Sequence, residues 1–311
     1  MLVLSPETVG EFIPSRRKDG HKGDFGRVLV VAGSREMTGA AVLTTRAALK
    51  AGAGLVSMAL PASLQVCTAG HVIEATSYGL SETLEGAIAP QAAGELLKII
   101  ERHKFDLLLI GPGLGASAGA VEFVQKFLKE CPLPAIVDAD ALNAIASTDK
   151  PDSFFGKGGP VRILTPHVRE AERILKTDNE TIEIFKEQSS LRLAAMANGV
   201  GVLKGHETVI GCVDNGDSPR CSAVNNNGSC ELAKAGSGDV LAGLMAGFWA
   251  QAGKSRGFTA ETAFESACAA VYLHGECGIL ARRELTEYCV LASELLERLP
   301  RAIKKTLIGE Q

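Results

Sequence analysis

Short, continuous apolar runs that alternate with helix-forming stretches constrain the fold of this chain most strongly. The runs lie at 28–32, 54–60, 105–110, 135–137, 161–164 and 200–203. Helix-forming stretches occupy 40–51, 95–103, 121–130, 167–176 and 179–198. A strand that is apolar throughout is buried on both faces, which is typical of a parallel sheet covered by helices on both sides. We therefore expect an α/β fold with a mostly parallel central sheet.

The pattern changes after residue 206. Strand-like stretches at 208–213 and 220–224 flank turn-forming residues at 214–217, which predicts a small β-hairpin near 206–224. Further helices are expected at 239–251, 259–281 and 292–299.

Length and composition limit the organisation and the class of function. The 311 residues suit one large α/β domain, which we expect over 1–311 with 1–20 as a short lead-in. A net charge of −4 and 5% aromatic residues argue against nucleic-acid binding. No apolar run reaches the roughly 18–20 residues that span a bilayer, and the N-terminus resembles no export signal. We expect a cytoplasmic protein without membrane contact; its eight cysteines lack Cys-x-x-Cys spacing and predict no zinc site.

The stretch 235–239 is the strongest candidate for a reactive site. Gly236, Ser237 and Gly238 precede Asp239, and an apolar helix follows directly. A helix N-terminus presents unpaired N–H donors and a positive dipole end, and glycines allow a phosphate to approach the backbone. An aspartate here can accept a proton from a hydroxyl that attacks phosphorus. We expect it to be ionised, with the ordinary pKa near 4. The alternative is a structural glycine-rich turn.

Further polar clusters directly follow predicted strands, so they should meet at one edge of the sheet. They lie at 111–115, 138–143, 165–170, 203–208 and 225–229. Each has an ordinary structural explanation: a tight turn at 111–115, a polar turn at 225–229, or an exposed loop lysine at Lys204. The glycines at 111–115 do not have the spacing of a dinucleotide fingerprint.

Two of these clusters contain side chains with a possible chemical role. Asp138 and Asp140 either provide oxygen ligands for Mg²⁺ through water or contact a polar substrate; in the structural alternative, Asp140 caps the next helix and Asp138 is solvated. At 165–170, Thr165 is placed to cap the next helix, and His167 is not needed for capping. Lys204 suits a phosphate as a mobile point charge.

The chain resembles the ADP-dependent NAD(P)H-hydrate dehydratase family, a branch of the ribokinase-like superfamily, from about residue 20 to 300. The sequence motifs that carry the resemblance occur in the family's order: HKGDFGR at 21–27, MTGAA at 37–41, AGAGLV at 51–56, IGPGLG at 110–115, DADALN at 138–143, LTPH at 164–167, LKG at 203–205 and AGSGDVLAG at 235–243. The chain departs from the family pattern at Val168–Arg169 and around Ser229–Cys230. The resemblance implies a ribokinase-like three-layer αβα sandwich.

The resemblance also implies a role for particular residues. Contacts to the hydrated nicotinamide nucleotide are implied for Gly39, Ala40, Ala41, Gly113, Gly115, His167 and Asp239. Contacts to ADP or AMP are implied for Lys204, Gly205, His206, Glu207, Thr208, Asn225 and Gly238. Gly236, Ser237, Gly238 and Asp239 would form the anion hole and the catalytic group.

The implied activity is repair of hydrated NADH or NADPH. ADP would be the co-substrate, and the products would be NAD(P)H, AMP and phosphate. Mg²⁺ would be held by the diphosphate, and no protein side chain is assigned as its direct ligand. The family often carries an epimerase domain before this region; we expect none here, and a separate epimerase as a pathway partner. The family also suggests a homotetramer.

Other functions share part of these features. A small-molecule kinase of the same superfamily would use the same glycine-rich loop and Asp239. A non-catalytic adenine-nucleotide sensor would bind ADP without turnover. A dehydrogenase is disfavoured by the glycine spacing at 111–115.

Overall fold

The computed structural model describes residues 1–155, 158–213 and 221–309, and it confirms the predicted α/β fold with a mostly parallel sheet. Among the described residues, ten strands form one sheet in the order β1-β10-β9-β8-β7-β6-β5-β2-β3-β4. Their bounds are β1 (Leu2–Val3), β2 (Arg27–Val31), β3 (Leu55–Pro61), β4 (Thr76–Leu80), β5 (Leu107–Ile110), β6 (Ala135–Val137), β7 (Arg162–Leu164), β8 (Val200–Leu203), β9 (Thr208–Cys212) and β10 (Cys221–Asn225).

Strand direction divides the sheet into two parts. The neighbours from β4 to β8 all pair in parallel, which places the carboxyl ends of these strands at one edge. Strand β9 is antiparallel to both β8 and β10, with Asn225 opposite Thr208 and Cys221 opposite Cys212. The predicted hairpin pairing is confirmed; its turn at 214–217 lies outside the described residues.

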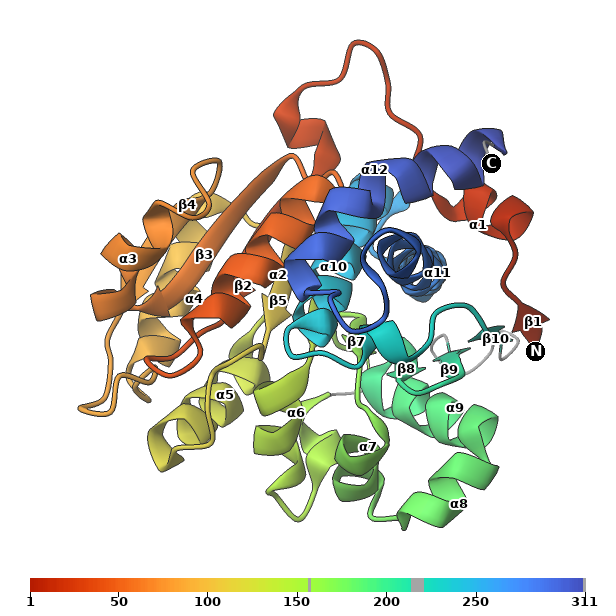
Figure 1. Ribbon diagram of the computed structural model, residues 1–311. Coiled ribbons are helices and arrows are strands. Elements are labelled where there is room, and N and C mark those ends of the chain that lie inside the picture. Colours follow the sequence, from red (N-terminus) through yellow and green to blue (C-terminus); the bar gives the residue numbers. More distant parts are fainter. Residues whose placement is uncertain (156–157, 214–220, 310–311) are drawn as a thin grey trace.

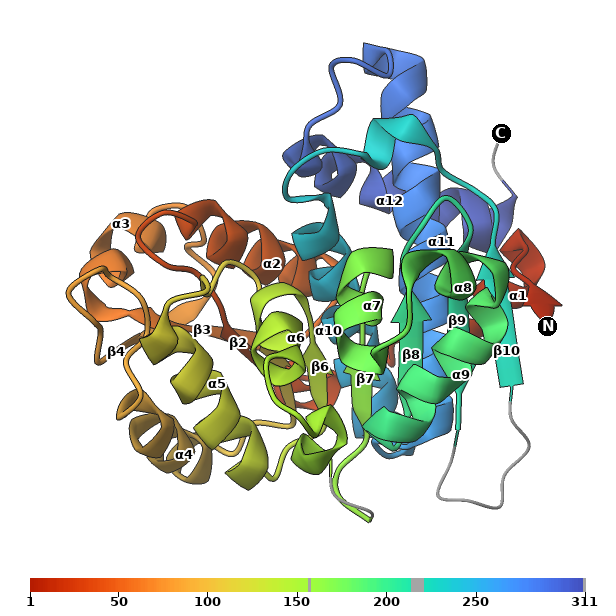
Figure 2. The same cartoon turned by 90° about the horizontal axis from the view of Figure 1, so that it is seen from below.

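Helices cover both faces of the sheet, so the molecule has three layers (Figures 1 and 2). The α-helices are α1 (Pro6–Phe12), α2 (Thr38–Lys50), α3 (Gln65–Ala69), α4 (Ala92–His103), α5 (Ala118–Glu130), α6 (Ala139–Ala146), α7 (Val168–Leu175), α8 (Asn179–Ile184), α9 (Lys186–Ala197), α10 (Ser237–Arg256), α11 (Ala260–Leu285) and α12 (Ala292–Ile308). Short 3₁₀ turns are η1 (Lys22–Phe25), η2 (Ala62–Leu64), η3 (Pro151–Phe154) and η4 (Cys230–Leu232).

Two large hydrophobic cores lie on opposite faces of the sheet. Val28 and Val30 of β2 face the core made with α2, α10, α11 and α12. Leu29 and Val31 face the core made with α4 to α9. Successive strand residues point to opposite faces, so a strand buried on both sides is apolar at every position. This explains why the continuous apolar runs predicted the strands.

Several elements differ from the sequence prediction. Strand β4 is a half-exposed edge strand without an apolar run, so no pattern indicated it. The helix expected at 179–198 is divided into α8 and α9 at Phe185, whose φ of −114° and ψ of 48° are not helical. The lead-in contains β1 and α1, and α1 begins at Pro6 after a Ser5 cap. Helix α6 starts directly after Asp138.

Helix α10 is the centre of one core and packs unusually closely on α2. A Cβ on Gly243 would lie 2.4 Å from both the Ala47 Cβ and the Thr44 carbonyl oxygen, and Gly247 makes a similar approach to Ala51. Because these positions lack side chains, the two helix backbones come into direct contact. Helix α10 therefore presents its N-terminus from a fixed position.

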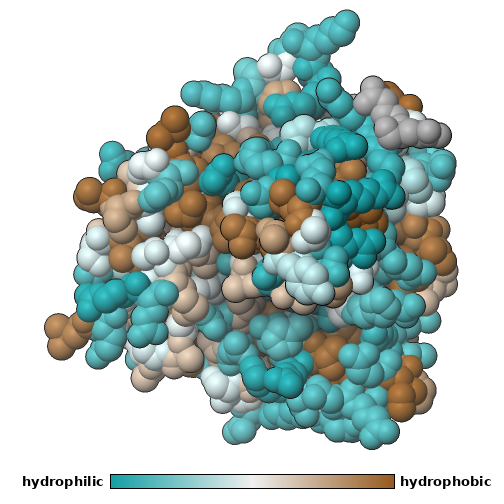
Figure 3. Space-filling view, in the orientation of Figure 1, coloured by the Kyte–Doolittle hydropathy of each residue, from teal (hydrophilic) through white to brown (hydrophobic). Residues whose placement is uncertain are grey.

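The surface carries scattered apolar side chains rather than one broad patch on the face shown in Figure 3. Among the most exposed are Val66 at 87% and Leu84 at 94%. In the part of the chain that the structure describes, no helix combines the length and apolarity needed to cross a membrane.

Candidate active site

The clusters that follow the parallel strands lie together, as expected from the sheet's direction. Asp138 follows β6, Thr165 follows β7 and Lys204 follows β8. The Lys204 Nζ donates to Asp138 Oδ1 at 2.8 Å, and the Thr165 Oγ1 donates to the same oxygen at 2.6 Å. Asp138 is 1% exposed, so the alternative in which Asp138 is solvated is wrong, and its charge is compensated by Lys204.

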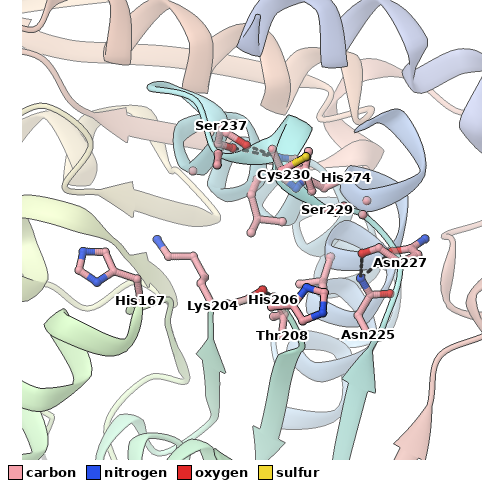
Figure 4. Close-up of a pocket in the computed structure, with 18 of the residues that line it drawn as sticks. His167, Lys204, His206, Thr208, Asn225, Asn227, Ser229, Cys230, Ser237 and His274 are labelled. Carbon is pink, nitrogen blue, oxygen red and sulfur yellow. Dashed lines mark hydrogen bonds between the residues drawn. The ribbon is translucent and has the colours of Figure 1, made fainter. Parts of the chain in front are cut away.

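A pocket of about 780 Å³ opens between this edge and the N-terminus of α10 (Figure 4). Its volume is in the range typical of small-molecule sites. Segments from β7 to α11 contribute to its wall, which is formed by His167, Lys204, Gly205, His206, Thr208, Asn225, Asn227, Gly228, Ser229, Cys230, Leu232, Ala233, Lys234, Ser237, Gly238, Leu241, Val271, His274 and Gly275. Most residues expected to contact ADP are in this set; Glu207 is not.

The start of α10 borders the pocket through its glycine-rich turn. Gly236 has a φ of +86°, a left-handed conformation that glycine adopts without strain. The Ser237 amide donates to the Lys234 carbonyl at 3.2 Å, so it is already engaged. The amides of Gly238 and Asp239 are in the first helical turn, where N–H groups have no partner within the helix. A Cβ on Gly238 would lie 3.7 Å from the Lys204 Nζ, so the ammonium group is next to this turn.

Asp239 differs electrostatically from the sequence expectation. Burial, together with the negative charges of Asp138 and Asp140, raises its pKa to about 6, although Lys204 acts in the opposite direction. The expected pKa near 4 is therefore wrong, because the helix N-terminus does not outweigh loss of hydration. Asp239 is still mostly ionised at neutral pH, and it is a stronger base than an ordinary aspartate.

Lys204 is held as a cation. Burial alone would lower its pKa, but the carboxylates of Asp138 and Glu170, with a smaller contribution from Asp239, outweigh burial and raise it. Figure 4 shows the Lys204 side chain extending from the end of β8 into the pocket. A fixed ammonium group at this point can compensate negative charge on a phosphate.

His167 has a structural role that the sequence did not indicate. Its Nδ1 accepts hydrogen bonds from the amides of Arg169 at 3.1 Å and Glu170 at 3.3 Å, so it caps α7. The prediction that Thr165 is the cap is wrong, since its hydroxyl is bonded to Asp138. Because Nδ1 is an acceptor, the neutral ring carries its proton on Nε2. Burial and the nearby Lys204 lower the His167 pKa, which favours this neutral form.

The residues expected to contact the nicotinamide lie mostly beside the pocket rather than in its wall. Gly39, Ala40 and Ala41 are in the first turn of α2. A Cβ on Gly113 would lie 2.7 Å from the Ala40 Cβ, so the loop after β5 packs on this turn. The Gly115 amide donates to Asp140 Oδ2 at 2.8 Å.

The N-terminal parts of two helices, α10 and α2, meet beside the pocket. A Cβ on Gly236 would lie 2.6 Å from Leu43 Cδ1 of α2, which brings the starts of α10 and α2 together. Asp140 lies within the first turn of α6, so the alternative that it caps this helix is wrong; it contributes to the electrostatic environment of Asp239 and holds Gly115. Asp239 is the charged group of α10 at this junction.

His274 is a site residue that sequence reasoning missed. It is 7% exposed, lines the pocket from α11, and its Nε2 contacts the Ser237 carbonyl at 3.0 Å and the Ser237 Oγ at 3.1 Å. Burial lowers its pKa to about 4, so it is neutral. A carbonyl can only accept, so Nε2 carries the proton and fixes the Ser237 peptide. Nothing in the local sequence of α11 distinguishes this position from core residues.

Asn225 lines the pocket, and its side-chain oxygen accepts no hydrogen bond. Its Nδ2 donates to Asn227 Oδ1 at 2.6 Å, while its buried Oδ1 has no hydrogen-bond partner. A buried acceptor without a partner is costly unless a ligand or water satisfies it. Asn227 in turn donates to the Tyr272 carbonyl at 3.1 Å, which fixes the pair against α11.

The described side chains form no cluster of three or more metal-ligating residues (His, Cys, Asp or Glu) placed to hold a metal ion. Asp138, the most buried carboxylate of the edge, is bonded to Lys204 and Thr165.

The fold and the pocket place the protein in the ribokinase-like class of α/β proteins. A solved structure from Enterococcus faecalis, described as a ribokinase-like superfamily protein, matches with a TM-score of 0.79 at 28% identity over 98% of this chain and 96% of that one. The ADP/ATP-dependent NAD(P)H-hydrate dehydratase from Bacillus subtilis, co-crystallised with ATP and Mg²⁺, matches with a TM-score of 0.76 at 28% identity over 98% of both chains.

The chain belongs to the NAD(P)H-hydrate dehydratase family, whose model matches residues 28–301. It is 30% identical to the ADP-dependent (S)-NAD(P)H-hydrate dehydratase of Listeria monocytogenes over 98% of this chain and 97% of that protein. It is 38% identical to a bifunctional NAD(P)H-hydrate repair enzyme of Moorella thermoacetica over 94% of this chain. The chain spans about half the length of the bifunctional relatives it matches; the match covers 52% of the Moorella protein.

Proposed function

We propose that this chain is a hydro-lyase that repairs hydrated NADH and NADPH, with ADP as co-substrate and the S-epimer as substrate. The observation that carries the proposal is that Lys204 and Gly238 line one pocket, while Asp239 directly follows Gly238 in the first turn of α10. This arrangement combines a base, a cation and helix N–H donors, which are the groups that phosphoryl transfer requires. The relatives' names supply the substrate class.

The proposed reaction has two stages. First, the hydroxyl oxygen on C6 of the hydrated ring attacks the β-phosphorus of ADP, the bond from that phosphorus to the bridging oxygen breaks, and AMP leaves. Asp239 takes the hydroxyl proton as the new P–O bond forms. Second, the ring nitrogen's lone pair expels phosphate from C6, and loss of a proton from the adjacent carbon restores the dihydropyridine. Phosphorylation is needed because hydroxide is a poor leaving group near neutral pH.

The positions proposed for the two reactants combine the pocket with the contacts that the family resemblance implies. ADP occupies the pocket, with its β-phosphate toward Lys204 and the amides of Gly238 and Asp239. The unpartnered Asn225 Oδ1 is available for a donor of the nucleotide. The hydrated ring lies on the side of the first turn of α2 and the loop after β5, and His167 contacts it through Nε2–H.

Mg²⁺ and the partners belong to the same proposal. Mg²⁺ would be held by the diphosphate and would supply charge compensation there. A separate epimerase supplies the S-epimer. The family resemblance supports a homotetramer in the cytoplasm.

The test is incubation of the purified protein with hydrated NADH and either ADP or ATP. We expect recovery of NADH absorbance with equimolar formation of AMP from ADP. A stable phosphorylated product would instead identify a small-molecule kinase of the same class. Nucleotide binding without turnover of the hydrate would identify a sensor and overturn the proposal.

A further inference from the structure

Two cysteines lie directly opposite each other in the β9–β10 ladder, away from the pocket. Cys212 is the last residue of β9 and Cys221 is the first residue of β10, and they are paired in register. Directly opposed residues in an antiparallel ladder have Cα atoms about 4.5–5.5 Å apart. Disulfides span Cα separations of about 4.4–6.8 Å, so this pair can be joined without moving the strands.

The two thiols differ in access. Cys221 is exposed, whereas Cys212 is buried against α11, where its Sγ donates to the Ala260 carbonyl at 3.5 Å. An exposed thiol beside a buried one in register can react first with a disulfide from solvent, and the buried thiol can then resolve the mixed disulfide.

The electrostatic environment also favours reaction at Cys221. A hydrogen bond from Cys212 lowers the Cys221 pKa to about 7, against smaller raising effects of burial and of Glu261. A third cysteine, Cys268 of α11, is fully buried. Burial raises the pKa of its thiol well above the ordinary value, so Cys268 is a poor nucleophile. The reactive thiol of this group is therefore Cys221.

We propose that Cys212 and Cys221 are a redox-active dithiol that low-molecular-weight disulfides oxidise to a cross-strand disulfide. The Cys221 thiolate attacks one sulfur of the small disulfide, forms a mixed disulfide and releases one small thiolate. The Cys212 sulfur then attacks the Cys221 sulfur, the Cys212–Cys221 bond forms, and the second small thiol leaves. The two protein thiols are oxidised, the small disulfide is reduced to two thiols, and the two protein protons end on them.

The experiment treats the fully reduced chain with glutathione disulfide, alkylates the remaining thiols and locates adducts and cross-links by peptide mass spectrometry. In the wild type we expect a Cys212–Cys221 cross-link that dithiothreitol reverses. In Cys212→Ala we expect a stable glutathione adduct at Cys221, because the resolving sulfur is gone. In Cys221→Ala we expect neither product at Cys212. Cys289→Ala, which removes another exposed cysteine, should keep the cross-link.

The wild-type protein alone can overturn the proposal, so it does not depend on the variants folding. A persistent glutathione adduct at Cys221 without a cross-link would contradict it. So would a cross-link from Cys221 to Cys268, or glutathionylation of Cys289 while Cys221 stays unmodified. Since none of these products depends on ADP or hydrated NADH, the result is independent of the proposed activity.

Discussion

At the scale of single residues, the proposed chemistry depends on one carboxylate. Asp239→Asn removes the proton acceptor and keeps the shape of the first turn of α10. General bases typically contribute about 10²–10⁴-fold to rate, so we expect a loss of that order in kcat. Steady-state assays with hydrated NADH measure the loss, and calorimetry with ADP should show retained binding.

The control is Asp149→Asn, an exposed aspartate before η3, which should leave kcat unchanged. Turnover of Asp239→Asn near the wild-type value would remove this residue from the mechanism.

A second residue-scale prediction concerns pH. Asp239 must be ionised to accept a proton, so kcat/KM should fall as the pH drops through about 6, the pKa that burial and Asp138 give it. Asp138→Asn removes a neighbouring negative charge, so the Asp239 pKa should fall and the acidic limb of the profile should move to lower pH.

The pH profiles of the wild type and of Asp138→Asn test this prediction. An acidic limb that stays in place while folding is intact would show that Asp138 does not influence the base, and one that moves to higher pH would contradict the predicted direction.

Several residue-scale properties could not be predicted from the sequence. The sequence indicated Asp239, Lys204 and His167 because each follows a strand or begins a helix. It gave the wrong pKa for Asp239, because burial depends on chain segments distant in sequence. It missed His274 because a buried histidine within a long helix has no local signature. The roles assigned to individual side chains stay predictions.

At the scale of elements, the contact between α2 and α10 can be tested with a matched pair of glycines. Gly243→Ala would place a Cβ 2.4 Å from Ala47 and Thr44, so the helices would have to separate. We expect a loss of about 1–3 kcal/mol in the free energy of unfolding, the usual cost of overpacking.

The control is Gly94→Ala in α4, where a Cβ would meet nothing within 4 Å. There the change should stabilise by about 0.4–1 kcal/mol, since it reduces the freedom of the unfolded chain. Denaturant titration measures both values, and equal effects at the two positions would contradict the close packing.

Elements with strong apolar patterns were predictable, and weakly patterned ones were not. The buried parallel strands and the hairpin pairing of β9 and β10 followed directly from sequence. Strand β4 has an exposed, polar character and is defined by its neighbour β3, so its own residues do not identify it. The division between α8 and α9 depends on one backbone conformation at Phe185.

At the scale of the whole molecule, the first residues are part of the packed structure. Val9 of α1 is 0% exposed and belongs to the core that contains α11 and α12. Figure 1 shows α1 beside α12, near the C-terminal end of the chain. Val9→Ala should lower the free energy of unfolding by about 2 kcal/mol, the order of a buried valine side chain.

Val66→Ala is the matched control, because this valine is 87% exposed and should change stability by less than about 0.5 kcal/mol. A negligible effect of Val9→Ala would mean that α1 contributes little to the folded state. These variants do not test whether residues 1–311 form one domain, which stays a prediction.

The glycine contacts between α2 and α10 have a consequence for how the site recognises its reactants. Gly236 lies near Leu43 and Gly247 near Ala51, so the two helices run in the same direction and begin at the same end. Their backbones leave no side-chain layer that could compress or expand. The contacts at Gly243 and Gly247 limit how the first turn of α2 and the carboxylate of α10 can move relative to each other, so under the proposed function a ring too large for that spacing would be excluded by size.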